Sequence, residues 1–203
     1  MSIRGNYVYL VISQSTFYNN TAIGEGGGAL HYDVRFGNVS IVESDFSYNT
    51  ALYCAIIDVD GLFHERINFT SSSFTYNRAT AEVPEGDIIC IRNATVFIVS
   101  STLSHNSAAQ HAGVFSIDGS IVTIVGSSFI NNTAAGDGGV MYTYYFPTIY
   151  SIYGSNFSQN TAGDDGGSYL LGERMVRSES RIAFSQITML LIEVGSLLLL
   201  LVQ

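Results

Sequence analysis

Charged residues are scarce in this sequence, and basic residues are the scarcest. Charged side chains make up 12% of the 203 residues, and 8 Lys and Arg stand against 17 Asp and Glu. The formal charge of -9 would repel a phosphate backbone, and Lys and Arg form no cluster, so no nucleic-acid partner is expected. Gly, Ser, Thr, Asn and Tyr are abundant instead, which is typical of strands and turns rather than surface helices. We therefore expect one all-β domain with a continuous core.

Cysteine is scarce as well. Cys54 and Cys90 form no CxxC pair and have no paired histidines nearby, so they indicate neither a zinc site nor a disulfide framework. Aligning residues 55–56 on residues 87–88 places the two cysteines roughly 13 Å apart along neighbouring strands, beyond the ~7 Å Cα limit of a disulfide. They are expected to be free buried thiols, and no cofactor or metal is expected.

No signal peptide is expected at the N-terminus, because only a short apolar run at residues 7–12 follows the first six residues. The chain is then either intracellular or a fragment of a longer protein. At the other end, residues 187–203 are almost wholly apolar. They could span a membrane, cap the last coil of the fold or be non-native sequence at a truncated end. A span needs about 20 apolar residues, and Glu193 would cost ~2.5 kcal/mol or more near the bilayer centre.

What the sequence does contain is a pattern repeated six times. Each copy is anchored on a large apolar residue, with intervals of 29, 28, 29, 26 and 28 residues between anchors: Phe17, Phe46, Phe74, Leu103, Phe129 and Phe157. A serine always stands two places before the anchor and an alanine five places after it. Apolar residues fill the fifth and seventh places before it. The third place after it is always asparagine: Asn20, Asn49, Asn77, Asn106, Asn132 and Asn160.

This motif predicts short strands whose alternate side chains face a core. Two three-residue steps break the alternation, one ending at the serine and one at the asparagine, and mark corners. A coil of roughly 28 residues with three short strands is typical of a right-handed parallel β-helix, whereas propeller blades need ~40 or more residues. We predict about six coils in residues 1–180, with stacked ladders of Phe and Asn, and a hydrophobic tail in residues 181–203.

The motif FxxN in these repeats resembles that of the polymorphic outer membrane proteins of chlamydiae, whose repeats carry FxxN and GGA(I/L/V). FxxN occurs in five copies, and Leu103 leads the sixth. The second motif is complete at residues 27–30 and partial at residues 138–141 and 166–169. The resemblance implies a pectin-lyase-like β-helix that is displayed at a cell surface and used in adhesion, and it implies no catalytic residues.

One column of each repeat carries chemistry, eight places after the anchor: Glu25, Cys54, Glu82, His111, Asp137 and Asp165. If the coils stack in register, Asp137 and Asp165 lie about 5 Å apart, near the carboxylate separation of retaining glycosidases. His111 would lie one coil away. A catalytic or calcium-binding group is one interpretation. The other is that residues 136–139 and 164–167 are outward turns, where Asp and Gly are favoured.

Six N-glycosylation sequons avoid the repeated asparagine column, which cannot be modified because alanine stands two places later. They are Asn19, Asn38, Asn68, Asn93, Asn131 and Asn156. The even spacing of the repeats leaves no room for the long loops that build enzyme clefts. It favours a non-enzymatic, surface-displayed or secreted scaffold for adhesion to an unknown protein or glycan. A polysaccharide lyase or glycosidase on the same fold is the alternative.

Overall fold

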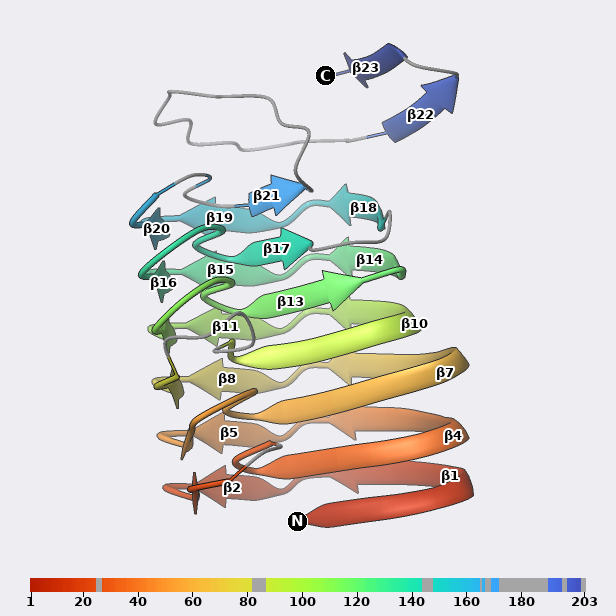
Figure 1. Ribbon diagram of the computed structural model, residues 1–203, viewed down its shortest axis with the longest axis vertical. Helices are drawn as coiled ribbons and strands as arrows, with labels where there is room; N and C mark the ends of the chain where they lie inside the picture. Colours follow the sequence, from red (N-terminus) through yellow and green to blue (C-terminus); the bar gives the residue numbers. More distant parts are fainter. Residues whose placement is uncertain are drawn as a thin grey trace.

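The repeats fold into strands that stack on their counterparts one turn later. The computed structural model describes residues 1–24, 27–81, 87–143, 148–164, 166, 169–171, 190–194 and 197–201. They form a β-solenoid of about five turns with roughly 28 residues per turn, and this described part contains no helix. The chain crosses the front of the solenoid from left to right, returns behind it and climbs towards the C-terminus, so the coil is right-handed (Figure 1). The predicted all-β parallel β-helix is confirmed.

Three parallel sheets run along the solenoid (Figure 1). The largest contains β1 (Ser2–Ser13), β4 (Leu30–Val42), β7 (Ile57–Thr70), β10 (Ile89–Val99), β13 (Phe115–Asp118), β14 (Ile121–Val125), β17 (Met141–Thr143), β18 (Ile149–Tyr153) and β21 (Tyr169–Leu171). The second holds the anchors, in β2 (Thr16–Tyr18), β5 (Asp45–Ser47), β8 (Ser73–Thr75), β11 (Thr102–Ser104), β15 (Ser128–Ile130) and β19 (Asn156–Ser158). The third holds the alanines, in β3 (Thr21–Ala22), β6 (Thr50–Ala51), β9 (Arg78–Ala79), β12 (Ser107–Ala108), β16 (Thr133–Ala134) and β20 (Thr161–Ala162).

The two predicted corners are left-handed backbone positions. In every repeat, the residues three places before and two places after the anchor have φ between 47° and 59°. Such a residue turns the chain between two extended segments, and Asn tolerates it better than most non-glycine residues. The second corner column presents its side chains outwards and consists of Asn19, Tyr48, Tyr76, His105, Asn131 and Gln159.

The anchors form the predicted ladder inside the solenoid. Phe17 stacks on Phe46 with ring centroids 4.5 Å apart, Phe46 on Phe74 at 5.2 Å, and Phe129 on Phe157 at 4.6 Å. Leu103 interrupts the stack. Two phenylalanines of the largest sheet, Phe69 and Phe115, contact the rings on either side of it, Phe74 and Phe129 respectively. The core is therefore continuous from coil to coil.

The repeated asparagines form a second ladder, also as predicted. The backbone N–H and Nδ2 of Asn49 both donate to Oδ1 of Asn77, at 3.0 and 2.9 Å, and the same pair of bonds links each neighbouring asparagine from Asn20 to Asn160. Nδ2 also donates to the anchor carbonyl of the preceding coil, as from Asn77 to Phe46 at 2.9 Å. Each buried side-chain amide thus bonds to backbone N–H and C=O groups at the corner, which a hydrophobic side chain could not do.

The C-terminal tail departs from the solenoid pattern. β22 (Leu190–Val194) and β23 (Leu197–Leu201) pair antiparallel, whereas the coils pair in parallel. The described parts of the chain include no helix with the length and hydropathy of a membrane span. Of the tail predicted for residues 181–203, residues 181–189, 195–196 and 202–203 lie outside the described residues.

Candidate functional site

The predicted chemical column is only partly brought together. His111 and Asp137 meet across one coil: Nδ1 of His111 accepts the Asp137 backbone N–H at 3.2 Å and lies 3.5 Å from Asp137 Oδ2. Asp165, Glu25 and Glu82 lie outside the described residues, so the predicted carboxylate pair stays a prediction. Among the residues that are described, no three His, Cys, Asp or Glu side chains form a group that could hold a metal ion.

The environment of His111 favours the neutral imidazole. The ring stacks on Tyr142 with centroids 4.4 Å apart and its side chain is 15% exposed. Burial lowers the pKa of His111, and the nearby carboxylates of Asp137 and Asp164 only partly oppose this shift. Because Nδ1 accepts an amide proton, the ring proton of the neutral form sits on Nε2. Nε2 lies 3.4 Å from the side-chain Nε2 of Gln110, and because both atoms carry protons this contact is not a hydrogen bond. Nδ1 thus accepts a proton from the next coil, and Nε2 carries the proton of the ring itself.

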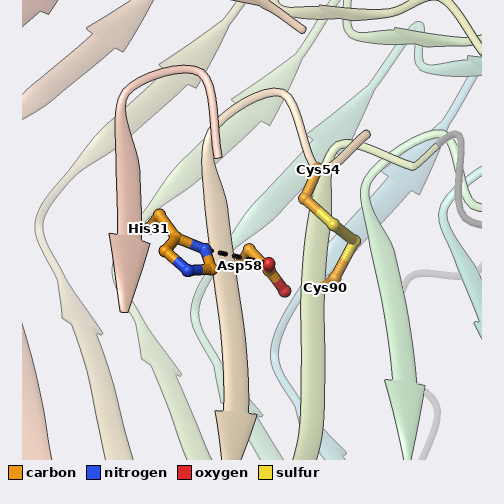
Figure 2. A network of polar contacts seen from close by, with 4 residues as sticks. All are labelled: His31, Cys54, Asp58 and Cys90. Atoms are coloured by element: carbon orange, nitrogen blue, oxygen red, sulfur yellow. Dashed lines mark hydrogen bonds and ion pairs between the residues drawn. A yellow bond between two sulfur atoms is a disulfide. The ribbon is translucent and has the colours of Figure 1, made fainter. Parts of the chain in front are cut away.

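The cysteines form a disulfide, so the prediction of free thiols is wrong. The predicted alignment holds, because the N–H of Ala55 donates to Asp87 O at 3.1 Å in the neighbouring coil. Cys54, however, precedes β7 and has φ of 44°, so the chain turns at this residue instead of continuing the strand. The distance calculated for an extended chain does not apply. The Cα atoms of Cys54 and Cys90 are 5.5 Å apart, and the bond joins two successive coils (Figure 2).

Beside the disulfide lies a histidine–carboxylate pair that the repeat columns did not reveal. Nδ1 of His31 is 3.1 Å from Oδ2 of Asp58, and Asp58 is in register with Cys90 on its other side (Figure 2). His31 follows its anchor by 14 residues and Asp58 follows its own by 12. Counted from the anchors, the two residues fall in different columns, although the strands pair them. The loops between the anchors and these strands differ in length, so the pair can be found only from the strand register.

Two polar side chains are buried in the first coils. The Tyr32 hydroxyl donates to the carbonyl of Val8 at 2.6 Å, and burial, with a smaller contribution from the Glu65 carboxylate, raises the pKa of Tyr32 to about 12. Glu65 is 2% exposed, and within the described part of the chain neither of its carboxylate oxygens has a hydrogen-bond partner. The Tyr32 phenol is therefore held in its protonated form and acts as a structural donor.

The sequons fall on outward or corner positions. Asn19 and Asn131 are exposed at left-handed corners with φ of 55°, and Asn156 is exposed in β19. The other three are partly exposed: Asn38 in β4, Asn68 in β7 and Asn93 in β10. The repeated asparagines of the inner coils, in contrast, are at most 1% exposed. The predicted separation of sequons from the inward column agrees with this placement, and their modification stays a prediction.

An outer ladder of aromatic rings runs parallel to the inner one. It consists of Tyr18, Tyr48, Tyr76 and His105, here called the tyrosine ladder. Tyr48 and Tyr76 stack with centroids 5.0 Å apart and planes 6° apart, and Tyr76 stacks on His105 at 4.6 Å. Tyr48 and Tyr76 are 48% and 47% exposed. Tyr48, Tyr76 and His105 project from the left-handed corner that follows the anchor strands, and Tyr18 projects from the end of β2.

The opposite corner of the same sheet bears a shallow polar hollow of about 450 Å³. Its lining consists of an amide, several hydroxyls and two carboxylates: Gln14, Ser15, Thr16, Glu43, Ser44, Asp45, Ser71 and Ser73. Glu43 Oε2 accepts a hydrogen bond from Gln14 Nε2 at 3.0 Å, and Asp45 Oδ2 accepts one from Ser47 Oγ at 2.6 Å. We call Glu43 and Asp45 the acidic pair.

Comparison with known families identifies the repeat. Residues 14–32 match the Chlamydia polymorphic membrane protein repeat. This stretch contains the first FxxN motif and the complete second motif at residues 27–30, and the β-solenoid fits a repeat of that family. The resemblance inferred from the sequence is therefore confirmed at the level of the repeat. No curated protein and no solved structure matches the chain.

Proposed function

We propose that this chain is a non-enzymatic β-helix scaffold, secreted or displayed at a cell surface, that serves in adhesion to a protein or glycan. The observation that carries the proposal is the nearly constant length of the repeats. Repeat intervals stay between 26 and 29 residues, so the repeats leave no room for the long inserted loops that build an enzyme cleft, and the strands of successive coils stack into regular sheets.

Two further observations support this role. The disulfide between Cys54 and Cys90 is of a kind that persists in oxidising environments such as the cell exterior. The matched repeat takes its name from chlamydial membrane proteins. A surface scaffold needs a rigid body that presents side chains at fixed intervals, and stacked ladders provide such a body.

A carbohydrate-active enzyme is the second candidate, and the meeting of His111 with Asp137 is the observation in its favour. Three features weigh against a catalytic base there. Nδ1 already accepts a backbone proton, Nε2 carries the proton of the neutral ring, and Tyr142 stacks on the ring. A general base needs a nitrogen free to reach the substrate.

The two candidates can be separated with the full chain. We expect the oxidised protein to bind saturably to cells or to immobilised surface extracts, and to release neither reducing ends nor unsaturated sugars from polysaccharides. Asp137→Asn/Asp165→Asn should leave both folding and binding unchanged, because Asn keeps the size and turn preference of Asp. A hydrolytic or lyase activity that this folded variant loses would establish the enzyme instead, and an absence of saturable binding would refute the scaffold.

A further inference from the structure

The tyrosine ladder and the acidic pair lie on one face of the solenoid. Asp45 begins β5 and Tyr48 directly follows its last residue, Ser47, whose hydroxyl donates to the Asp45 carboxylate. Ser47 points outwards, since the Phe46 ring beside it points into the core, yet it is only 6% exposed. Ser47 is therefore covered by neighbouring side chains of the same face, between Asp45 and Tyr48.

The rings of the ladder are ordered before any partner arrives. Tyr48 and Tyr76 hold each other in a nearly parallel stack while about half of each side chain remains exposed. Ordering a mobile side chain on binding costs roughly 0.5–1.5 kcal/mol. Because these rings are already ordered by stacking, a partner that binds them loses less conformational entropy. Tyrosines are also among the residues enriched at the centres of protein interfaces.

The way the rings are stacked favours a protein over a sugar. Tyr76 lies between Tyr48 and His105, which cover its two faces, so Tyr76 offers its ring edge and phenol hydroxyl to the outside. A pyranose binds an aromatic ring by lying on its face, and those faces are occupied. A side chain that approaches from outside can instead pack along the edges and bond to the hydroxyls.

The acidic pair specifies the sign of the partner's charge. The donors to Glu43 and Asp45 are a neutral amide and a neutral hydroxyl, which orient the carboxylates without cancelling their charge. A guanidinium group pairs with carboxylates through two parallel hydrogen bonds, so arginine is the residue that fits the acidic pair. The net charge of -9 would also attract a basic partner over a distance.

We propose that the face formed by the tyrosine ladder and the acidic pair binds an arginine-rich segment of a protein partner. This rests on the proposed scaffold function and names its binding face. The segment lies across β5 and β8, with guanidinium groups on Glu43 and Asp45 and its remaining side chains against Tyr48 and Tyr76.

The test is a titration of the full oxidised chain with an oligo-arginine peptide at moderate salt. Tyr48→Ala/Tyr76→Ala and Glu43→Gln/Asp45→Asn should each weaken binding by at least about tenfold, as expected for central interface residues. The matched control for the rings is Tyr7→Ala/Tyr9→Ala, which removes tyrosines that are 74% and 75% exposed in β1. The matched control for charge is Asp137→Asn/Asp164→Asn. Both controls should bind within about twofold of the unmodified chain.

Three results would overturn the proposal. The peptide could fail to bind, the controls could lose as much affinity as the test variants, or a neutral oligosaccharide such as chitohexaose could bind this face while the peptide does not. Cell adhesion by the same variants separates this failure from failure of the proposed function. A chain that adheres equally with and without Tyr48 and Tyr76 keeps its scaffold role but uses another face, whereas a chain that never adheres loses both.

Discussion

The first coil and the inner coils carry the same motif but bury it to different extents. Phe46 and Asn49 are fully buried, whereas Phe17 is half-buried and Asn20 is exposed. The local contacts are the same, since Phe17 stacks on Phe46 and Asn20 donates to Asn49. The difference is the number of neighbours: an inner residue has a coil on each side in the described structure, and a residue of the first coil has one. Stability in this fold is thus set by stacking between coils.

The largest expected effect comes from removing one anchor ring from an inner coil, to be compared with removing one from the first coil. Phe129→Ala should lower the free energy of unfolding by about 3–5 kcal/mol, because the ladder cannot fill the cavity. Phe17→Ala should cost roughly 1–2 kcal/mol, because its ring is already partly solvated. Denaturant unfolding measures both values. Equal costs would show that the anchor contributes within its own coil rather than through its neighbours.

The disulfide should sharpen the comparison, because it joins two successive inner coils. Cys54→Ser/Cys90→Ser should lower the free energy of unfolding by about 2–4 kcal/mol, the usual value for a native disulfide that closes a loop of moderate length. The two cysteines are 36 residues apart in the sequence. Thermal unfolding with and without a reductant is the measurement. Reduction should destabilise the unmodified chain and leave the double variant unaffected; a reductant effect of the same size on both proteins would contradict the bond.

The asparagine ladder offers a smaller version of the same contrast. Asn77→Ala leaves the backbone and side-chain donors of Asn49 without their acceptor. Water does not replace the lost acceptor, because the site of Asn77 is only 1% exposed. The expected cost is about 1–3 kcal/mol. Asn20→Ala removes an exposed side chain and should cost less than about 1 kcal/mol. Urea unfolding of the two variants compares them, and a larger loss for Asn20 would reverse the account.

How much of the structure the sequence predicts depends on whether a feature lies on the repeat columns. The ladders of Phe and Asn and the two corners follow directly from the columns, because strand register keeps those columns aligned. The disulfide and the pairing of His31 with Asp58 do not follow, because the corner loops differ in length and Cys54 sits in a turn. The tyrosine ladder was within reach of the sequence, since Tyr48 and Tyr76 each stand two places after an anchor.

The smallest expected effect concerns pH at the corner of His111. Because the pKa of His111 is lowered in the fold, the unfolded chain binds this proton first as the pH falls. Stability should therefore decline once the pH drops below about 6.5 and level off below the folded pKa, where both states are protonated. The measurement is the unfolding free energy between about pH 7 and pH 5, with His111→Gln as the control that should flatten this part of the curve. A gain in stability on acidification that depends on His111 would contradict the sign.

The most direct test of the central claim, that successive repeats stack in register, is cross-linking between coils. Ser107 and Thr133 are exposed partners on β12 and β16, and Thr161 follows one coil further on. With Ser107→Cys/Thr133→Cys, oxidation should form a disulfide, because neighbouring strands lie about 4.8 Å apart. With Ser107→Cys/Thr161→Cys it should not, because two strand spacings exceed the ~7 Å Cα limit. A bond in the second variant, or none in the first while it remains folded, would contradict the stacked solenoid.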